Sequence, residues 1–445
     1  MLESYSEAKQ LPHLLMNENS GVSGFIQSNS TTSREDLSVK KIGASFALMV
    51  MSVSAAHAQS SITLYGVVDP DIVFVNNAQT GRSGGQLTGK QQYSMMDATT
   101  SAYFGSRFGL KGVEDLGGGM TALFTLENGF NAANGTLGQG GLLFGRQAFV
   151  GLSAAAGRVT FGRQYSSLWD FVSPLAVITQ WAGYLGSHPD DLDNIGGTNR
   201  QNNSLKYTSP TWNGITANAL YSAGGVAGSF SENQIWSVGM GYTGGPVRVG
   251  IALVDAFNPN TSIYGSTPTA GGAATNNFGS FGSATSAQRN PIIAGYASVH
   301  REQIFGMGGS YIAGPATLGL VYTNTRFAGL GSSSGPNPLS YSGSSTFNTV
   351  EANLQFQVTV PVSVGLAYSF TKDDGPNDQS ARYQQVTAGV HYFFSKRTDV
   401  YMVAAYQRAS GTNSLGQSAV ASIAGMTPSS RNQQVVDTIG LAHRF

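Results

Sequence analysis

A stretch without strand or helix periodicity, from Tyr165 to Asn203, gathers charged side chains that could act on ions. Its acidic cluster and the arginines beside its two ends are Asp190, Asp191, Asp193, Arg163 and Arg200. An unpatterned segment of this length inside a regular β-rich protein is uncommon unless it has a function. Charged side chains in a narrow passage decide which ions cross it. We therefore interpret the stretch as a segment that folds back into a β-barrel and narrows it.

The remaining chemical motifs do not form a catalytic or metal site. Carboxylates bind Ca²⁺, but the spacing of the three aspartates matches no EF-hand loop. The Gly-x-Ser-x-Gly pattern at 331–335 lies in a Gly/Ser-rich loop and not at the strand-to-helix turn that a nucleophilic serine needs. The histidines beyond residue 58 show no metal-ligand spacing; they are His188, His300, His391 and His443. We expect no enzyme activity, no metal and no cofactor.

The composition favours a membrane protein built from strands. Of 445 residues, 41% are hydrophobic and only 11% are charged, against a usual charged share of about 25%. The mean hydropathy is near zero, at -0.08, and no stretch beyond residue 58 has the roughly 18 consecutive apolar residues of a spanning helix. A closed β-barrel is the other structure that satisfies its backbone in lipid. The 24 basic and 24 acidic residues balance, which excludes a nucleic-acid binder.

The N-terminal region has the pattern of an export signal. Lys40 and Lys41 precede an apolar run from Ile42 to Val53, and the small-x-small triplet that ends at Ala58 follows. This is a secretory signal peptide at 39–58, cleaved after Ala58. Since a signal peptide normally begins a chain, we expect residues 1–38 to be a non-native extension and Val39 to be the true start. Residues 59–445 then form the β-barrel domain.

The clearest strand runs from Asn348 to Val358. One face carries Val350, Ala352, Leu354, Phe356 and Val358, and the other carries Thr349, Glu351, Asn353, Gln355 and Gln357. Because side chains alternate between the two faces of a strand, one face is apolar and the other polar. An apolar outside around a polar inside is typical of a barrel in lipid.

Sixteen such segments follow one another, joined alternately by short turns and long loops. They are 61–75, 106–115, 120–130, 141–152, 158–165, 203–209, 215–224, 234–243, 247–256, 303–312, 316–326, 347–358, 362–371, 384–394, 399–410 and 434–445. The notable long loops are 76–105, 166–202, 257–302, 327–346 and 411–433. Outer-membrane barrels have even strand counts, short periplasmic turns and long outer loops. The pattern predicts an all-β fold, a 16-stranded antiparallel transmembrane β-barrel whose third outer loop, 166–202, folds inward.

Several stretches resemble the general porins of β-proteobacteria. They are Ser61–Gly66, Ser106–Gly119, Phe144–Leu152, Phe161–Tyr165, Asn203–Tyr207 and Gly440–Phe445. The resemblance implies a homotrimer in the bacterial outer membrane, exported through the periplasm and in contact with outer-membrane lipid and lipopolysaccharide. It implies a water-filled channel for passive diffusion of ions and small hydrophilic solutes.

The resemblance also implies that basic residues of the barrel wall face acidic residues of the inward loop. The basic candidates are Arg107, Arg146, Arg200, Lys111 and Arg163, and the acidic ones are Asp190, Asp191 and Asp193. Arg107 shares its face with Lys111 and is opposite to Phe108, which places it inside. Phe149 lies on the other parity from Arg146, which also favours the inside for Arg146. Arg163 shares its parity with Phe161, which places it outside unless the strand bulges.

The wall arginines predict a weak preference for anions, because the sequence does not determine how much negative charge the loop brings to the channel. The alternatives are structural salt bridges for the arginines and a solvated turn after Pro189 for the aspartates. An alternative function is a substrate-specific sugar channel, because Tyr165, Trp169 and Trp181 could offer an aromatic path.

Overall fold

The structure is a computed structural model that describes residues 60–97, 101, 103–265 and 275–445. The chain divides into two units, Met1–Ala58 and Gln59–Phe445. The predicted extension and signal peptide, 1–58, lie outside the described residues. Among those that are described, no helix has the length and apolar character to cross a membrane.

The strands of the unit Gln59–Phe445 form one antiparallel sheet that closes on itself. They are β1 (Ser61–Val68), β2 (Pro70–Ser83), β3 (Gln86–Asp97), β4 (Arg107–Gly117), β5 (Met120–Gly129), β6 (Gln147–Ala154), β7 (Gly157–Gln164), β8 (Gln201–Thr208), β9 (Ile215–Ser222), β10 (Ile235–Gly244), β11 (Val247–Phe257), β12 (Arg301–Ala313), β13 (Ala316–Leu330), β14 (Gly343–Thr359), β15 (Val362–Asp374), β16 (Arg382–Phe393), β17 (Thr398–Ser410) and β18 (Gln433–Arg444). The helices and 3-10 turns are short: η1 (Gln139–Gly141), α2 (Ser167–Phe171), η2 (Ser173–Leu175), α3 (Val177–Gln180), η3 (Gly183–Gly186), η4 (Pro189–Asp191), α4 (Pro259–Ser262) and η5 (Ala294–Tyr296).

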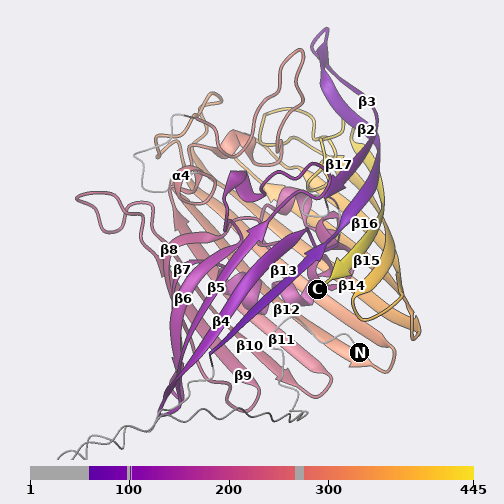
Figure 1. The fold of residues 1–445 in the computed structure, drawn as a ribbon. Helices are drawn as coiled ribbons and strands as arrows, with labels where there is room; N and C mark the ends of the chain where they lie inside the picture. The colour runs from indigo at the N-terminus through magenta and orange to yellow at the C-terminus, as the bar shows by residue number, and fades with distance from the viewer. Residues whose placement is uncertain (1–59, 98–100, 102, 266–274) are drawn as a thin grey trace, which may run out of the picture. The chain divides into compact units, whose positions relative to one another are not determined.

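The ring contains sixteen strand positions, which run from β1 through β4 to β18 and back to β1. β2 continues β1 beyond Asp69, pairs with β18, and carries β3 beside it. Figure 1 shows the closure, with the indigo β2 and β3 beside the yellow end of the chain. The predicted sixteen-stranded antiparallel β-barrel is confirmed.

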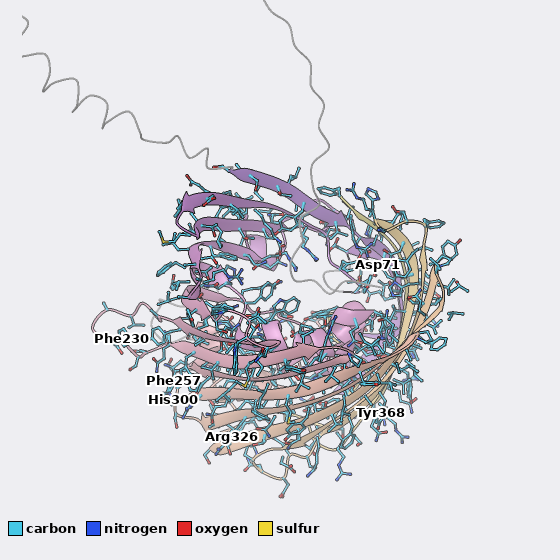
Figure 2. The ribbon with its side chains drawn as sticks, turned by 90° about the horizontal axis from the view of Figure 1, so that it is seen from below. Asp71, Phe230, Phe257, His300, Arg326 and Tyr368 are labelled. Atoms are coloured by element: carbon cyan, nitrogen blue, oxygen red, sulfur yellow. The ribbon has the colours of Figure 1, made fainter. Side chains whose placement is uncertain are left out.

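The alternation of apolar and polar side chains follows the two faces of the barrel wall. On β14, Val350 is 45% exposed, whereas Thr349 and Glu351 are each 1% exposed. In Figure 2, Tyr368 of β15 lies on the outside of the ring and Asp71 of β2 on its inside. The apolar face therefore points outward, where lipid replaces the second sheet of a soluble protein.

Long connections gather at one rim and short turns at the other (Figure 1). The predicted loop 76–105 is wrong in most of its length, because β2 extends to Ser83 and β3 returns from Gln86 to Asp97. Gly84 and Gly85 join these strands with φ of 57° and 81°, the left-handed conformations that a two-residue hairpin turn needs. The hairpin is rich in polar residues, so it has no apolar alternation that identifies it as strand.

Residues 165–200, here called the inner segment, pack against the inside of the wall. Helix α2 contacts β10 and β11, and Figure 2 shows the short pink helices inside the ring. A Cβ at Gly250 of β11 would lie 1.9 Å from the carbonyl oxygen of Phe171. Glycine in the wall therefore allows the backbone of the inner segment to approach the strand.

A second segment fills the interior nearer the long-loop rim. Tyr296 and its neighbours Ile292 and Ile293, from the connection 258–300, pack in one buried cluster with Leu192 of the inner segment and Phe347 of β14. The Tyr296 hydroxyl donates to Asp373 Oδ2 at 3.0 Å. The sequence predicted an outer loop here, but part of it forms an internal layer.

Candidate functional site

A single carboxylate, Glu127 of β5, organises charged side chains on the inner face of the first strands of the ring. Arg146 Nε donates to Glu127 Oε1 at 2.7 Å. The Tyr65 hydroxyl of β1 donates to Oε2 at 2.8 Å, and Arg107 Nε of β4 lies 4.0 Å from the same oxygen. The Glu127 side chain is 7% exposed. Charge-assisted hydrogen bonds of this kind hold their partners in fixed orientations.

Tyr165, the first residue of the inner segment, links this group to the far end of the segment. Its hydroxyl accepts hydrogen bonds from Arg146 Nη2 at 3.1 Å and from Arg200 Nη2 at 2.8 Å. The Arg200 guanidinium also lies 4.8 Å from the centroid of the Tyr165 ring. The two ends of the inner segment are thereby joined to the wall at one place.

Lys111 of β4 completes what we call the basic cluster: Arg107, Lys111, Arg146 and Arg200 around Glu127. Lys111 is exposed, and its Nζ lies 4.5 Å from the centroid of the Tyr65 ring. Burial alone would lower the pKa of Arg146, but Tyr165 and Glu127 raise it, whereas burial lowers the pKa of Arg200. Arginines stay protonated in proteins, so four cations surround one carboxylate.

Some of the predicted basic residues lie where the strand alternation places them, and others do not. Arg107 and Lys111 lie on the inner face of β4, as the alternation predicts. The parity argument for Arg146 does not hold, because Phe149 pairs with Thr125 and lies on the inner face. Arg146 reaches the cluster in another way. Arg146 precedes the first residue of β6, and its side chain turns inward to Glu127.

Arg163 does not join the basic cluster, and its assignment as a constriction residue stays a prediction. It lies on β7 with the outward parity of Phe161, which is 54% exposed. Its guanidinium donates to the carbonyl oxygens of Gly145 at 2.8 Å and Arg200 at 3.3 Å. Arg163 therefore holds the connections at the base of the inner segment.

Among the described residues, the hydrogen bonds of the three predicted aspartates are with residues outside the basic cluster. Asp193 is fully buried; its Oδ2 accepts from the Thr323 hydroxyl at 2.6 Å and forms an ion pair with His188 Nδ1. His188 Nε2 lies 3.3 Å from Glu351 Oε2 of β14. This buried group attaches the inner segment to the wall on the side of β13 and β14.

Asp190 and Asp191 serve the fold of the inner segment. Asp191 is 4% exposed and accepts from the Gly196 N–H at 2.7 Å and the Thr198 hydroxyl at 2.6 Å. Asp190 accepts from the Ser422 hydroxyl at 2.8 Å. Both border a cavity of about 550 Å³ that Arg289 also lines. Carboxylates satisfy backbone N–H groups that a loop leaves unpaired, so Asp191 and Asp193 stabilise the inner segment, and their role at the constriction stays a prediction.

Burial raises the pKa of Asp190 to about 7 and that of Asp191 to about 6, the latter with a contribution from nearby Asp193. Within the described part of the chain, no group of three or more His, Asp or Glu side chains is placed to hold a metal ion.

Sequence reasoning missed Glu127, Tyr65 and Tyr165 as members of the site. The alternation could have identified the first two, since Glu127 shares the inner face of β5 with Thr125, and Tyr65 pairs with Gly109 on β4. Nothing in the sequence indicates that Tyr165 accepts from two arginines. Of the aromatic residues suggested for a sugar path, Trp181 is 1% exposed and Tyr165 is 5% exposed.

Comparisons with known proteins agree on one family. A model of the Gram-negative porin family matches residues 44–412. An outer membrane porin protein of Bordetella pertussis is 31% identical over 51% of this chain and 62% of its own length. Outer membrane porin protein 32 of Delftia acidovorans is 28% identical over 90% of this chain and 98% of its own length.

Two solved structures have a similar fold. The anion-selective porin from Comamonas acidovorans has a TM-score of 0.63 at 20% identity and covers 87% of this chain and 100% of its own. The trimer form of OmpT from Vibrio cholerae has a TM-score of 0.55 at 14% identity, over 87% of this chain and 99% of its own.

Proposed function

Because the chain belongs to the Gram-negative porin family, we propose that it is a general-diffusion channel whose basic cluster favours small anions. The protein is an outer-membrane β-barrel through which ions and small hydrophilic solutes pass by passive diffusion. Its family is one of channels, and we propose that the chain has no catalytic role. The channel, in this proposal, narrows between the inner segment and the wall formed by β1, β4 and β5.

The observation that carries the ion preference is the charge of the basic cluster. Four cationic side chains surround Glu127, and the aspartates of the inner segment are engaged elsewhere. Charges in a passage with low-dielectric walls focus the field and raise the local concentration of the opposite ion. The Comamonas acidovorans porin, which has a similar fold, is described as anion-selective.

The decisive substitution is Lys111→Gln, because Lys111 is the exposed cation of the cluster and its removal leaves no buried partner. We expect the chloride/potassium permeability ratio to fall about twofold, the effect of roughly 0.4 kcal/mol between unit charges about 10 Å apart in water. Reversal potentials in planar bilayers under a salt gradient measure the ratio. Arg326→Gln, on the outward face of β13, changes the net charge equally and should leave the ratio unchanged. A ratio that is equal in both variants and the wild type would reject the proposal.

General diffusion is favoured over a sugar-specific channel because Trp181 and Tyr165 are almost completely buried. Liposome swelling with sugars of graded size separates the two functions. We expect rates that fall smoothly with size. Saturable uptake of one sugar would favour the specific channel.

We propose that the protein is a homotrimer. Asp437 of β18 supports this, because it lies on the outward face between Ala404 of β17 and Phe74 of β2. Its neighbour on the same face, Ile439, is 53% exposed. Charged side chains on a lipid-facing surface are destabilising, so a neighbouring copy that covers this face explains the carboxylate. The trimer form of Vibrio cholerae OmpT has a similar fold.

A further inference from the structure

The cavity of about 550 Å³ that Asp190 and Asp191 border lies among connecting segments and not against the barrel wall. Its lining comes from the inner segment, the connection 258–300 and the connection 411–433, and none of its lining residues belongs to a β-strand. We call it the outer cavity, because both connections belong to the long-loop rim (Figure 1). Its volume is within the range of about 300–1,000 Å³ that is usual for small-molecule sites.

Hydrogen bonds between the three segments hold the walls of the outer cavity in place. The side-chain amide of Gln79 on β2 donates to Gln288 Oε1 at 3.0 Å, and its backbone N–H donates to the carbonyl oxygen of Pro428 at 2.9 Å. On the other side, the Ser422 hydroxyl donates to Asp190 Oδ2 at 2.8 Å. A site whose walls are already fixed loses less conformational entropy when a small molecule binds.

One part of the lining has hydrogen-bond acceptors without enough donors. Among the described residues, the Ser422 hydroxyl is the one donor that reaches the Asp190 carboxylate, which has about four acceptor positions when it is ionised. The side-chain oxygen of Asn290, another lining residue, is buried and has no hydrogen-bond partner within the described chain. This part of the outer cavity therefore suits a donor group with a positive charge.

Arg289 brings a positive charge to the same cavity. It is exposed, and no ion pair joins it to an acidic residue, or Asp190 to a basic one, in the described ranges. Opposite charges thus line the outer cavity without contact between them. A molecule with both an ammonium and a carboxylate group would pair with both charges, whereas a simple ion would pair with one.

The outer cavity also has an apolar part. The rings of Tyr264 and Phe278 lie with their centroids 4.3 Å apart, and Phe278 is 2% exposed. Met426, from the connection 411–433, lines the same cavity and is 7% exposed. Sites for small molecules combine apolar walls with a few polar groups that fix the orientation of the ligand. An apolar side chain of the ligand would find its place here.

We propose that the outer cavity binds an α-amino acid with an apolar side chain. The ammonium group of the ligand donates to Asp190 and Asn290, its carboxylate accepts from Arg289, and its side chain contacts Tyr264 and Phe278. The inference rests on the proposed function only for the route by which the solute arrives. No residue of the basic cluster lines the outer cavity, so this binding is separate from the ion preference.

The test is a calorimetric titration of the full-length protein in detergent at pH 8, above the raised pKa of Asp190 of about 7. The ligands are L-leucine, 4-methylpentanoate, which lacks the ammonium group, and 3-methylbutylamine, which lacks the carboxylate. The variants are D190N and R289Q. Their matched controls, D378N and R431Q, remove the same charges from exposed residues that do not line the outer cavity. Single-channel conductance shows that each barrel is intact.

We expect the wild type to bind leucine about tenfold more tightly than either analogue, because each analogue lacks one charge-assisted hydrogen-bond partner. D190N should bind leucine about tenfold more weakly than the wild type, and no better than it binds 4-methylpentanoate. R289Q should show the same loss, and should bind leucine no better than 3-methylbutylamine. Both control variants should bind leucine like the wild type.

Equal wild-type affinity for leucine and its two analogues would overturn the proposal, as would undiminished leucine binding by R289Q, whose exposed side chain the fold does not need. Tighter binding of 3-methylbutylamine than of leucine would overturn it also, and would assign the outer cavity to simple cations. K111Q should bind leucine like the wild type whatever its effect on the chloride/potassium permeability ratio. Failure of the proposed ion preference is therefore distinguishable from failure of this inference.

Discussion

Glu127 determines both the position and the net charge of the basic cluster. It contacts Arg146 and Tyr65 directly and lies near Arg107. A carboxylate among cations lowers the attraction of the site for anions, and it also offsets the repulsion between Arg107 and Arg146. Glu127 therefore stabilises the arrangement of the basic cluster but reduces its preference for anions.

Glu127→Gln should raise the chloride/potassium permeability ratio by about twofold, opposite in sign to Lys111→Gln and similar in size. The same change should lower the thermal stability, since removal of one partner from a buried ion pair costs about 3 kcal/mol. Reversal potentials and thermal unfolding in detergent measure the two effects. A ratio that falls would contradict the placement of Glu127 at the narrowest part of the channel.

At the scale of elements, the inner segment is attached to the wall through His188. Burial alone would lower the pKa of His188, but Asp193 and Glu351 raise it to about 10. A raised histidine pKa contributes stability that is fully present below its ordinary value of about 6.5 and is lost as the pH rises through 10. The attachment therefore weakens in alkaline solution.

Thermal unfolding in detergent at pH 7 and at pH 10.5 tests this attachment. The wild type should lose more stability between these values than His188→Gln, which has no imidazolium to lose. At pH 7 the variant should be less stable by about 3 kcal/mol, because Asp193 and Glu351 remain buried without their cation. An identical pH dependence in both proteins would contradict a charged His188.

Glycines in the wall make room for the inner segment at defined points. A Cβ at Gly365 would lie 2.2 Å from Trp181, whereas one at Gly309 would be no closer than 3.5 Å to any neighbour. We expect Gly365→Ala to push Trp181 and the inner segment toward the lumen and to lower the single-channel conductance. Gly309→Ala is the matched control and should conduct like the wild type; equal conductance of all three proteins would count against the packing.

The regular elements could be predicted from the sequence because their physics is local. Val350 and Glu351 of β14 lie on the expected faces, since one side of every strand meets lipid. The contacts of Asp193 could not be predicted, because its partners, His188 and Thr323, come together only in the folded chain. The burial of Tyr296 was missed for the same reason. Its buried contacts are with distant strands and loops, and the spacing of apolar residues in the sequence does not indicate them.

In the assembled protein, either lipid or a neighbouring copy covers the outside of β18, and variants of Asp437 distinguish the two. If a second copy covers this face, Asp437→Leu removes a polar contact and lowers the temperature at which trimers dissociate on a gel. Asp437→Asn, which keeps hydrogen-bonding capacity, should dissociate at a higher temperature than Asp437→Leu. Greater stability of the leucine variant than of the wild type would place the face in lipid.

The seam between β1 and β18 constrains how the protein can be assembled. Val67 pairs with Arg444, and the backbones of Gly66 and Phe445 exchange hydrogen bonds at 3.2 and 3.1 Å. The final strand is the one that seals the cylinder, so a nascent or truncated chain that lacks it has two bare sheet edges, and such edges recruit other chains. Closure of the barrel therefore requires β18, and we expect a chain that stops before β18 to aggregate rather than to form a smaller pore.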